Sequence, residues 1–373
     1  MSMPGRSRPI GVAIVAPSLR ILGGQAVQAQ RLLDAWKDDP DIRAWLVPVN
    51  PVPPWPLQHL TRVRFARTIV TQLAYWPLLV RELRRADVVH VFSASYLSFL
   101  LAPLPAVLTA RLLGKPVVLN YRSGEAPDHL KRSRIARAVL RATNRNVVPS
   151  RFLREVFASH GIAATVVPNI VDLGRFKFRV RQPLRPHLLS TRNFEGLYNV
   201  ACTLRAFALV QARYPDATLT LVGAGRERDR LERLAADLEL RHLRFAGAVP
   251  PAEIWRYYAE ADIYLQTPDI DNMPSSVIEA FASGCATVST DAGGVPAILE
   301  DGVHGLLAPC GDHAAAAACV IRLLEEPALA ASLAERARKS CEDYQWSAVR
   351  PQWVATYSAL TPEPRAIASS LPA

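Results

Sequence analysis

Cysteine and lysine are scarce in this chain, which has five of each among 373 residues. The cysteines are odd in number and lack metal-ligand spacing, so we expect reduced thiols and no disulfide framework. The longest apolar stretch, residues 96–113, is interrupted by Pro103, Pro105 and Arg111, which favours a buried helix and loop over a membrane span. The apolar run at residues 10–16 is only strand-length, so no signal peptide is expected. These features predict a globular cytoplasmic protein.

Acidic residues are few in the first half of the chain. Residues 1–180 contain 26 Lys+Arg and 10 Asp+Glu, a net +16, whereas residues 181–373 contain 18 and 23, a net −5. This asymmetry indicates an anionic partner, either a membrane surface, a phosphate-bearing acceptor or nucleic acid. Nucleic acid is not expected, because no stacking aromatics interleave with arginine in an RNA-binding pattern. Residues 61–85 form either a basic amphipathic surface for lipid head groups or an ordinary helix pair with solvated arginines.

Short β-rich runs alternate with helical stretches, which is typical of βαβ units and parallel sheets. The length suits two domains, and residues 177–186, rich in Arg and Pro, mark a boundary. We therefore expect an α/β fold with two doubly wound, Rossmann-like domains that face a cleft. The expected domains are residues 1–178 and 187–340, with a C-terminal helix in residues 341–373 that packs back on the first domain. The expected strands are residues 11–16, 45–48, 88–92, 116–120, 146–149, 165–168, 187–190, 218–222, 243–246, 263–266 and 286–289.

The most informative segment for function is residues 271–285. Pro274 suits the first helical position and Gly284 suits the end of the helix. Glu279 is the one ionisable group on this apolar helix, and such a charge requires a polar partner. Asp271 precedes the helix start, where a carboxylate and free backbone N–H groups face one space. The two acids predict a site for a polyhydroxylated, anionic ligand.

Three further signals follow predicted strands. Gly23 and Gly24 precede a predicted helix, where glycine lets the backbone approach a phosphate, although a plain tight turn explains them equally well. Arg192 is either a guanidinium that grips a diphosphate or an ordinary surface arginine. Gly223 is either a turn glycine or a point where a ligand approaches the backbone.

No cofactor is predicted. The dinucleotide fingerprint Gly-x-Gly-x-x-Gly is absent. Asp269-Ile270-Asp271 matches a metal-binding Asp-x-Asp motif only superficially, because no His or Cys stands nearby and the acids flank a helix start. We therefore expect no metal.

Together these features resemble the retaining GT-B glycosyltransferases of family four, the glycogen-synthase-like and mannosyltransferase-like group. The resemblance covers most of the chain and is most specific over residues 245–308. The matching segments are Phe245-Ala-Gly-Ala-Val249, Ala261-Asp262, Asp271 to Gly284, Gly293-Gly294-Val-Pro and His304-Gly-Leu-Leu-Ala, with Ser150-Arg-Phe-Leu and Val167 to Asp172 at the end of the first domain.

The resemblance implies a nucleotide-sugar donor held mainly by the second domain, with the acceptor on the first. Glu279 matches the acid that binds ribose hydroxyls, and Asp271 stands where the family usually has the glutamate that faces the donor sugar. Arg192 matches the diphosphate-binding arginine. The other implied donor contacts are the phosphate loop Gly23 and Gly24, Gly223 in its turn, Val249 near the base, and the backbone of Asn272, Met273, Pro274 and Ser275.

Three departures from the family pattern concern the reacting centre. The first acid is Asp271, one methylene shorter than glutamate. The family's diphosphate lysine is missing, and Leu197, Tyr198 and Asn199 fill that stretch. The family's histidine at the donor sugar corresponds to Arg122, which either replaces the lost cation at the phosphates or indicates a different donor or weakened catalysis.

The expected reaction is transfer of a hexose from a nucleotide diphosphate to an acceptor hydroxyl, with retention of anomeric configuration and without metal or cofactor. Asp271, Arg192 and Arg122 are the expected catalytic residues. The expected acceptor is a glycan or a lipid-linked, membrane-proximal molecule, at the inner face of the membrane. The alternative is a GT-B epimerase or a degenerate, binding-only subunit, which would carry Glu279 and Gly24 as well. The sequence does not predict the base, the sugar or the acceptor.

Overall fold

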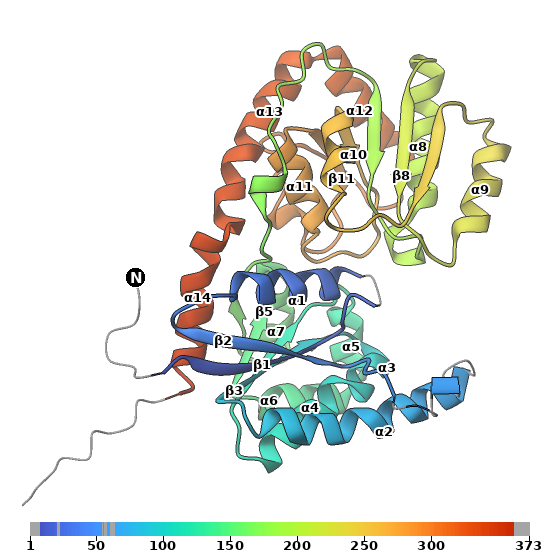
Figure 1. Ribbon diagram of the computed structural model, residues 1–373. Coiled ribbons are helices and arrows are strands. Elements are labelled where there is room, and N and C mark those ends of the chain that lie inside the picture. The colour runs from blue at the N-terminus through green and yellow to red at the C-terminus, as the bar shows by residue number, and fades with distance from the viewer. Residues whose placement is uncertain (1–7, 21–22, 54, 56–57, 60–63, 362–373) are drawn as a thin grey trace, which may run out of the picture. The chain divides into compact units, whose positions relative to one another are not determined.

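The computed structural model describes residues 8–20, 23–53, 55, 58–59 and 64–361 and shows two parallel sheets of six strands each (Figure 1). The first sheet has the order β2-β1-β3-β4-β5-β6 and the second has the order β12-β11-β10-β7-β8-β9. The strands of the first sheet are β1 Ile10–Ala16, β2 Ile42–Pro48, β3 Val88–Ser93, β4 Val117–Tyr121, β5 Arg145–Val148 and β6 Thr165–Val166. Those of the second are β7 His187–Ser190, β8 Thr218–Val222, β9 Leu243–Gly247, β10 Ile263–Leu265, β11 Ala286–Thr290 and β12 Leu306–Ala308.

The predicted α/β class with two doubly wound sheets is confirmed. All eleven predicted strands are present, with ends that differ by up to three residues. The sequence prediction missed β12, because Leu306–Ala308 is three residues long and too short to show a period.

Contacts divide the chain into two compact units. The first contains residues 1–121, 135–147 and 350–373, and the second contains residues 122–134 and 148–349. This grouping records which residues pack together and does not test where each domain folds on its own. The predicted domains 1–178, 187–340 and 341–373 therefore stay predictions.

In the first unit, helices cover both faces of the sheet. Figure 1 shows α1 on one face and α2 and α4 on the other. From Arg350 onward, α14 also packs in this unit, because Arg350 forms ion pairs with Asp39 and Asp41 at 2.7 and 2.6 Å. The hydroxyl of Tyr357 lies 2.7 Å from Nδ1 of the buried His90 on β3. The helices with most of their residues in this unit are α1 Gly24–Ala35, α2 Arg64–Leu83, α3 Tyr96–Leu101, α4 Pro103–Leu112, α6 Arg134–Ala142 and α14 Trp346–Ser358.

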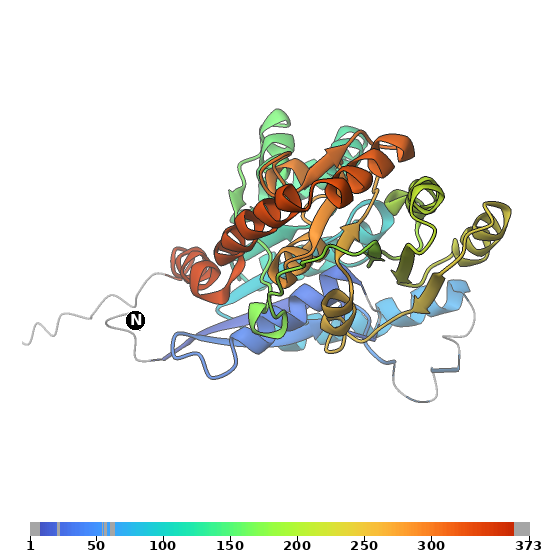
Figure 2. The same cartoon turned by 90° about the horizontal axis from the view of Figure 1, so that it is seen from above.

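In the second unit, successive strand residues enter two different apolar clusters, as the alternation of side chains along a strand requires. Leu188 packs in the cluster of α8, α9 and α12, whereas Leu189 packs in the cluster around α11. Figure 2 shows α8 and α9 beside β8 and β9, at the edge of the sheet. The helices are α5 Ala126–Arg132, α7 Arg151–Ser159, α8 Val200–Arg213, α9 Arg228–Asp237, α10 Trp255–Glu260, α11 Ser275–Ser283, α12 His313–Glu325 and α13 Pro327–Ser340, and short 3-10 turns include Gly196–Tyr198 and Val295–Ala297.

The segment at residues 177–186 has no helix or strand, and an ion cluster around the buried Asp262 holds it. Asp262, with no exposed surface, pairs with Arg179 and Arg185 at 2.5 and 2.9 Å. Arg181 is 6% exposed, and all five of its N–H groups have acceptors. Three of these acceptors are the carbonyl oxygens of Tyr258, Ala261 and Ser283, where α10 and α11 end. Arg181 therefore satisfies helix ends that would otherwise be left without partners.

Candidate functional site

Arg192 and Asp271 form a nearly buried ion pair at one edge of the second sheet. Arg192 follows β7 and Asp271 follows β10, and these two strands are neighbours whose carboxyl ends meet. The side chains are 9% and 12% exposed, and a guanidinium nitrogen donates to the Asp271 carboxylate. A second nitrogen donates to Ser276 Oγ at 3.2 Å, whereas Nε is buried without an acceptor among the described residues. The site therefore holds a fixed guanidinium with an unused donor.

Burial and neighbouring charge shift the pKa of Arg192 in opposite directions. Desolvation lowers its pKa, but the carboxylate of Asp271 and the nearby tyrosines outweigh this effect, so the pKa of Arg192 is raised. The guanidinium is therefore charged at every physiological pH. A permanently charged donor in a water-poor place is suited to an anionic group such as a phosphate.

The helix α11 has the limits that its sequence predicted, within one residue. It begins at Ser275, with Pro274 as its N-cap, and it ends at Gly284 in the left-handed conformation with φ 78°. Glu279 is 7% exposed, and its carboxylate accepts a hydrogen bond from the Tyr258 hydroxyl at 3.1 Å. The predicted need of this buried charge for a polar partner is thus met by α10.

The loop that precedes α11 is fixed by residues from two other segments. Asn169 donates from its side-chain amide to the Met273 carbonyl at 2.9 Å, and its backbone N–H lies 3.3 Å from the Met273 sulfur. Ser150 donates to the Asn272 side-chain oxygen. Arg122 donates to the Asn169 side-chain oxygen, and burial lowers its pKa to about 9, so it stays charged at neutral pH. Arg122 therefore reaches the predicted donor loop through Asn169.

Two glycines allow the site loops to lie in direct contact with neighbouring turns. A Cβ added at Gly223 would lie 2.1 Å from the carbonyl oxygen of Arg192, and one at Gly294 would lie 1.9 Å from the carbonyl oxygen of Asn272. Both distances are far inside van der Waals contact, so any side chain would displace the loops that carry Arg192 and Asn272. Packing within the fold thus accounts for Gly223, and its role toward a donor stays a prediction.

Most of the predicted site residues lie together in the second unit. This group contains Arg122, Arg192, Gly223, Asp271, Asn272, Met273, Pro274, Ser275 and Glu279. Val249 follows β9 and packs against the apolar cluster around α11. Gly23 and Gly24 belong to the first unit, where Gly23 is the N-cap of α1. The roles of all these residues toward a ligand remain predictions.

Sequence reasoning missed four side chains that build the site. Ser276 and Tyr198 contact Arg192, Tyr258 contacts Glu279, and Asn169 holds the loop before α11. Single Ser, Tyr and Asn residues carry no periodic signal. Two hints were nevertheless available, since Tyr198 lies in the stretch where a lysine was expected and Asn169 lies in a segment that matched the family.

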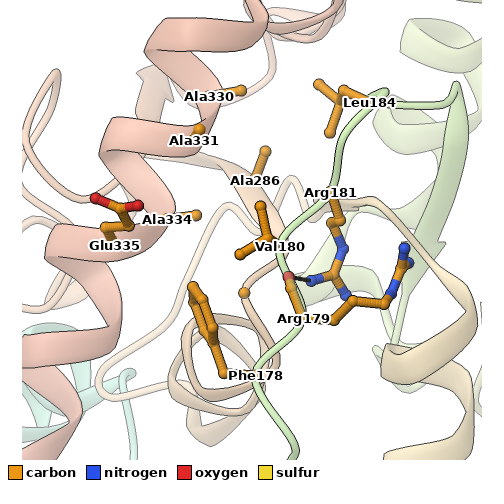
Figure 3. A pocket seen from close by; sticks show the side chains of 11 residues that line it. Phe178, Arg179, Val180, Arg181, Leu184, Ala286, Ala330, Ala331, Ala334 and Glu335 are labelled. Atoms are coloured by element: carbon orange, nitrogen blue, oxygen red, sulfur yellow. Dashed lines mark hydrogen bonds between the residues drawn. The ribbon is translucent and has the colours of Figure 1, made fainter.

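A separate small pocket lies elsewhere in the second unit, between the segment at residues 178–184, the end of α11 and α13 (Figure 3). Its lining is largely apolar, with Val180, Leu184 and Ala334 among its side chains. None of the predicted site residues lines it. Among the described residues, no group of three or more His, Cys, Asp or Glu side chains is arranged to hold a metal ion. No helix within the residues that the structure describes is both long enough and apolar enough to span a bilayer.

Comparison with known families covers nearly the whole chain. The family described as "Glycosyltransferase Family 4" matches residues 20–175, and "Glycosyl transferases group 1" matches residues 177–340. The chain is 27% identical over 310 residues to a phosphatidyl-myo-inositol mannosyltransferase of Mycolicibacterium smegmatis, which covers 78% of each chain. It is 26% identical over 303 residues to the glycogen synthase of Mycobacterium tuberculosis, covering 75% of this chain and 72% of the relative.

Solved structures agree on the fold. HepE of Anabaena, solved in complex with UDP and glucose, superposes with a TM-score of 0.72 at 17% identity, covering 94% of this chain and 100% of that one. Together with the two parallel sheets, this similarity confirms the predicted GT-B fold.

Proposed function

Because the chain belongs to the family-four, group 1 glycosyltransferases, which transfer a sugar from a nucleotide donor, we propose that it is a retaining hexosyltransferase with a membrane-proximal acceptor. The observation that carries the donor half of this proposal is the fixed, nearly buried guanidinium of Arg192 beside Asp271. In the proposed reaction the bond from the anomeric carbon to the diphosphate breaks, and a bond to the acceptor oxygen forms on the same face. The acceptor's proton passes to the leaving phosphate.

Charge on the leaving diphosphate is the main electrostatic demand of this reaction. Arg192 would meet it with its Nε–H and with the N–H group that donates to Asp271 in the structure. Asp271, once released, would orient a sugar hydroxyl. Arg122 is the second proposed cation at the phosphates, and Gly23 and Gly24 keep the phosphate-loop role that the family resemblance implies. The proposal includes no metal and no cofactor.

The nucleoside half of the donor is assigned to the surroundings of Glu279. The Glu279 carboxylate accepts a hydrogen bond from the Tyr258 hydroxyl, and carboxylate oxygens are the acceptors that suit ribose hydroxyls. In the proposal, Val249 lies near the base, Gly223 lets the donor approach the backbone, and the backbone from Asn272 to Ser275 meets the sugar hydroxyls. This assignment rests on the family resemblance of these positions and on their shared place in the second unit.

The acceptor half of the proposal rests on an exposed face of α2 in the basic first unit. Ile69, Leu73 and Trp76 are 62%, 65% and 40% exposed, and their spacing of four and three puts them on one helix face. Arg81 in the last turn of α2 and Arg85 just beyond its end are exposed as well, and both lie within ion-pair distance of Glu82. An apolar face with a basic end fits a bilayer surface with anionic head groups. The proposed location is therefore the cytoplasmic face of the membrane. Residues 61–63 of the predicted basic segment lie outside the described residues.

The donor proposal is tested with purified protein and a panel of UDP-, GDP- and ADP-sugars. One nucleoside diphosphate is expected to raise the melting temperature selectively, because a ligand that binds only the native state stabilises it. With its sugar and a lipid extract as acceptor, the product is expected to keep the anomeric configuration of the donor, read by NMR. A flat thermal response to every nucleotide contradicts the donor site, and an inverted product contradicts retention.

The membrane proposal is tested by sedimentation with phospholipid vesicles. The wild-type protein is expected to bind vesicles with anionic head groups, and Ile69→Gln with Leu73→Gln is expected to weaken binding at least tenfold. Leu209→Gln on α8, a side chain that is 43% exposed, is the matched control and is expected to bind as wild type does. Equal binding by the double variant would show that α2 is not the lipid contact.

A further inference from the structure

The guanidinium of Arg192 lies over the aromatic ring of Tyr198. The Arg192 carbon Cζ is 3.9 Å from the centre of the ring. The edge of the same guanidinium is held by Ser276 and Asp271. A cation over an aromatic face is attracted by the ring's quadrupole, and arginine also stacks well because it is planar. Three different side chains thus restrict the orientation of the Arg192 guanidinium.

The position of Tyr198 is set by its neighbours in the backbone. The carbonyl oxygen of Leu197 accepts hydrogen bonds from the backbone N–H groups of Asp269 and Ile270 at 3.0 and 3.2 Å. On the other side, the Asn199 amide donates to the Asp269 carboxylate at 3.0 Å, and the Thr267 hydroxyl donates to the Asn199 carbonyl at 3.0 Å. The ring is therefore fixed to the same loop that continues into Asp271.

We propose that Tyr198 is a positioning residue for the donor diphosphate. It acts through Arg192, whose orientation it fixes, and it stands in the stretch where the resembling family carries a second cation. This inference rests on the proposed function, in which Arg192 binds the diphosphate. A guanidinium binds phosphate best through two parallel N–H bonds, and that geometry depends on the plane of the group. Without the ring, Arg192 keeps its charge and loses the fixed plane.

If Tyr198 acts through Arg192, loss of its ring should lower the affinity for a nucleoside diphosphate and leave the affinity for the nucleoside unchanged. Tyr198→Leu is expected to weaken binding of the preferred nucleoside diphosphate about tenfold and to leave affinity for the matching nucleoside unchanged, both measured by calorimetry. Tyr198→Phe keeps the ring and is expected to bind both ligands as wild type does. With a nucleotide-sugar as substrate, kcat/KM is expected to follow the diphosphate affinity.

Tyr214 provides a matched control in the same unit. It pairs with Arg213 at 5.7 Å from Cζ to ring centre, away from the site residues, so Tyr214→Leu removes a cation–aromatic pair of the same kind. That variant is expected to bind the diphosphate as wild type does. If Tyr198→Leu does not fold, Tyr198→Met, with a flexible side chain of similar length, takes its place.

Three outcomes would overturn the inference while leaving the proposed function standing. They are unchanged diphosphate affinity in Tyr198→Leu, an equal loss for diphosphate and nucleoside, and a loss in Tyr198→Phe as large as that in Tyr198→Leu. The second outcome indicates a structural role for the residue, and the third indicates that the hydroxyl matters instead of the ring. A wild-type protein that binds no nucleoside diphosphate would contradict both the inference and the proposed function.

Discussion

Arg181 and Arg192 are both buried arginines of the second unit, 6% and 9% exposed, yet their surroundings are opposite in kind. Every N–H group of Arg181 has an acceptor, and four of the five acceptors are backbone carbonyls. Arg192 has one carboxylate, one hydroxyl and one aromatic ring, and its Nε lacks an acceptor among the described residues. The completed environment belongs to an arginine that joins segments of the fold. The incomplete one belongs to an arginine that has capacity left for a ligand.

The largest difference between the two arginines is expected in stability, when Arg181 is substituted. Arg181→Met keeps much of the side chain's volume but leaves three buried helix-end carbonyls without the donors that Arg181 supplies. A loss of about 3–5 kcal/mol in the free energy of unfolding is expected, because each buried acceptor left without a donor costs about 1–3 kcal/mol. Urea denaturation measures it.

Arg213→Met is the control for this experiment. Arg213 pairs with Glu325 at 3.5 Å, with side chains that are 65% and 50% exposed. Exposed pairs of this kind contribute about 0–1 kcal/mol. A loss in Arg181→Met no larger than in Arg213→Met would mean that the segment at residues 177–186 is held by something other than Arg181.

The next effect is expected on turnover and concerns Arg192. Arg192→Ala is expected to lower kcat about a hundredfold or more, by analogy with loss of one donor to a developing anion. Its melting temperature is expected to fall less than that of Arg181→Met, because Asp271 still accepts a hydrogen bond from the Asn272 backbone N–H at 2.8 Å. Steady-state kinetics and a thermal melt test both parts. Near-normal turnover removes Arg192 from the mechanism.

The smallest effect is expected on diphosphate affinity and concerns Asp271, the acidic partner of Arg192. Asp271 pairs with the guanidinium that is proposed to bind the diphosphate, so the two anions are expected to compete for it. Asp271→Asn is expected to tighten binding of the nucleoside diphosphate several-fold, up to about tenfold, or about 1.4 kcal/mol. The same variant is expected to turn over more slowly, because the proposed contact to the sugar hydroxyl is weakened. Calorimetry and initial rates measure the two changes, and weaker diphosphate binding would show that Asp271 does not compete.

The sequence predicted the sheets better than it predicted the site, for physical reasons that particular residues show. Buried parallel strands are continuous apolar runs, so β1, β3 and β11 are visible in the sequence, whereas β12 is too short. The need of Glu279 for a polar partner follows from its apolar helix. The partner itself, Tyr258, lies 21 residues away and depends on how α10 packs against α11.

Arg181 shows the opposite limit of sequence reasoning. Its stretch is rich in arginine and proline and has no apolar period, which predicts only a domain boundary. In the structure the same stretch contains one of the most completely hydrogen-bonded side chains of the second unit. Composition shows that charge is present, but only the fold brings Asp262 and two helix ends to the same place.

The contact between Gly294 and the Asn272 carbonyl has a consequence for engineering this enzyme. The spacing between the two turns is set by the absence of a side chain, since a Cβ at Gly294 would lie 1.9 Å from that oxygen. If the loop at Asn272 were replaced by that of a relative, its distance from the Gly293-Gly294 turn would change. The replacement would therefore have to include the Gly293-Gly294 turn. The two turns lie 22 residues apart in the chain, but they have to be replaced together.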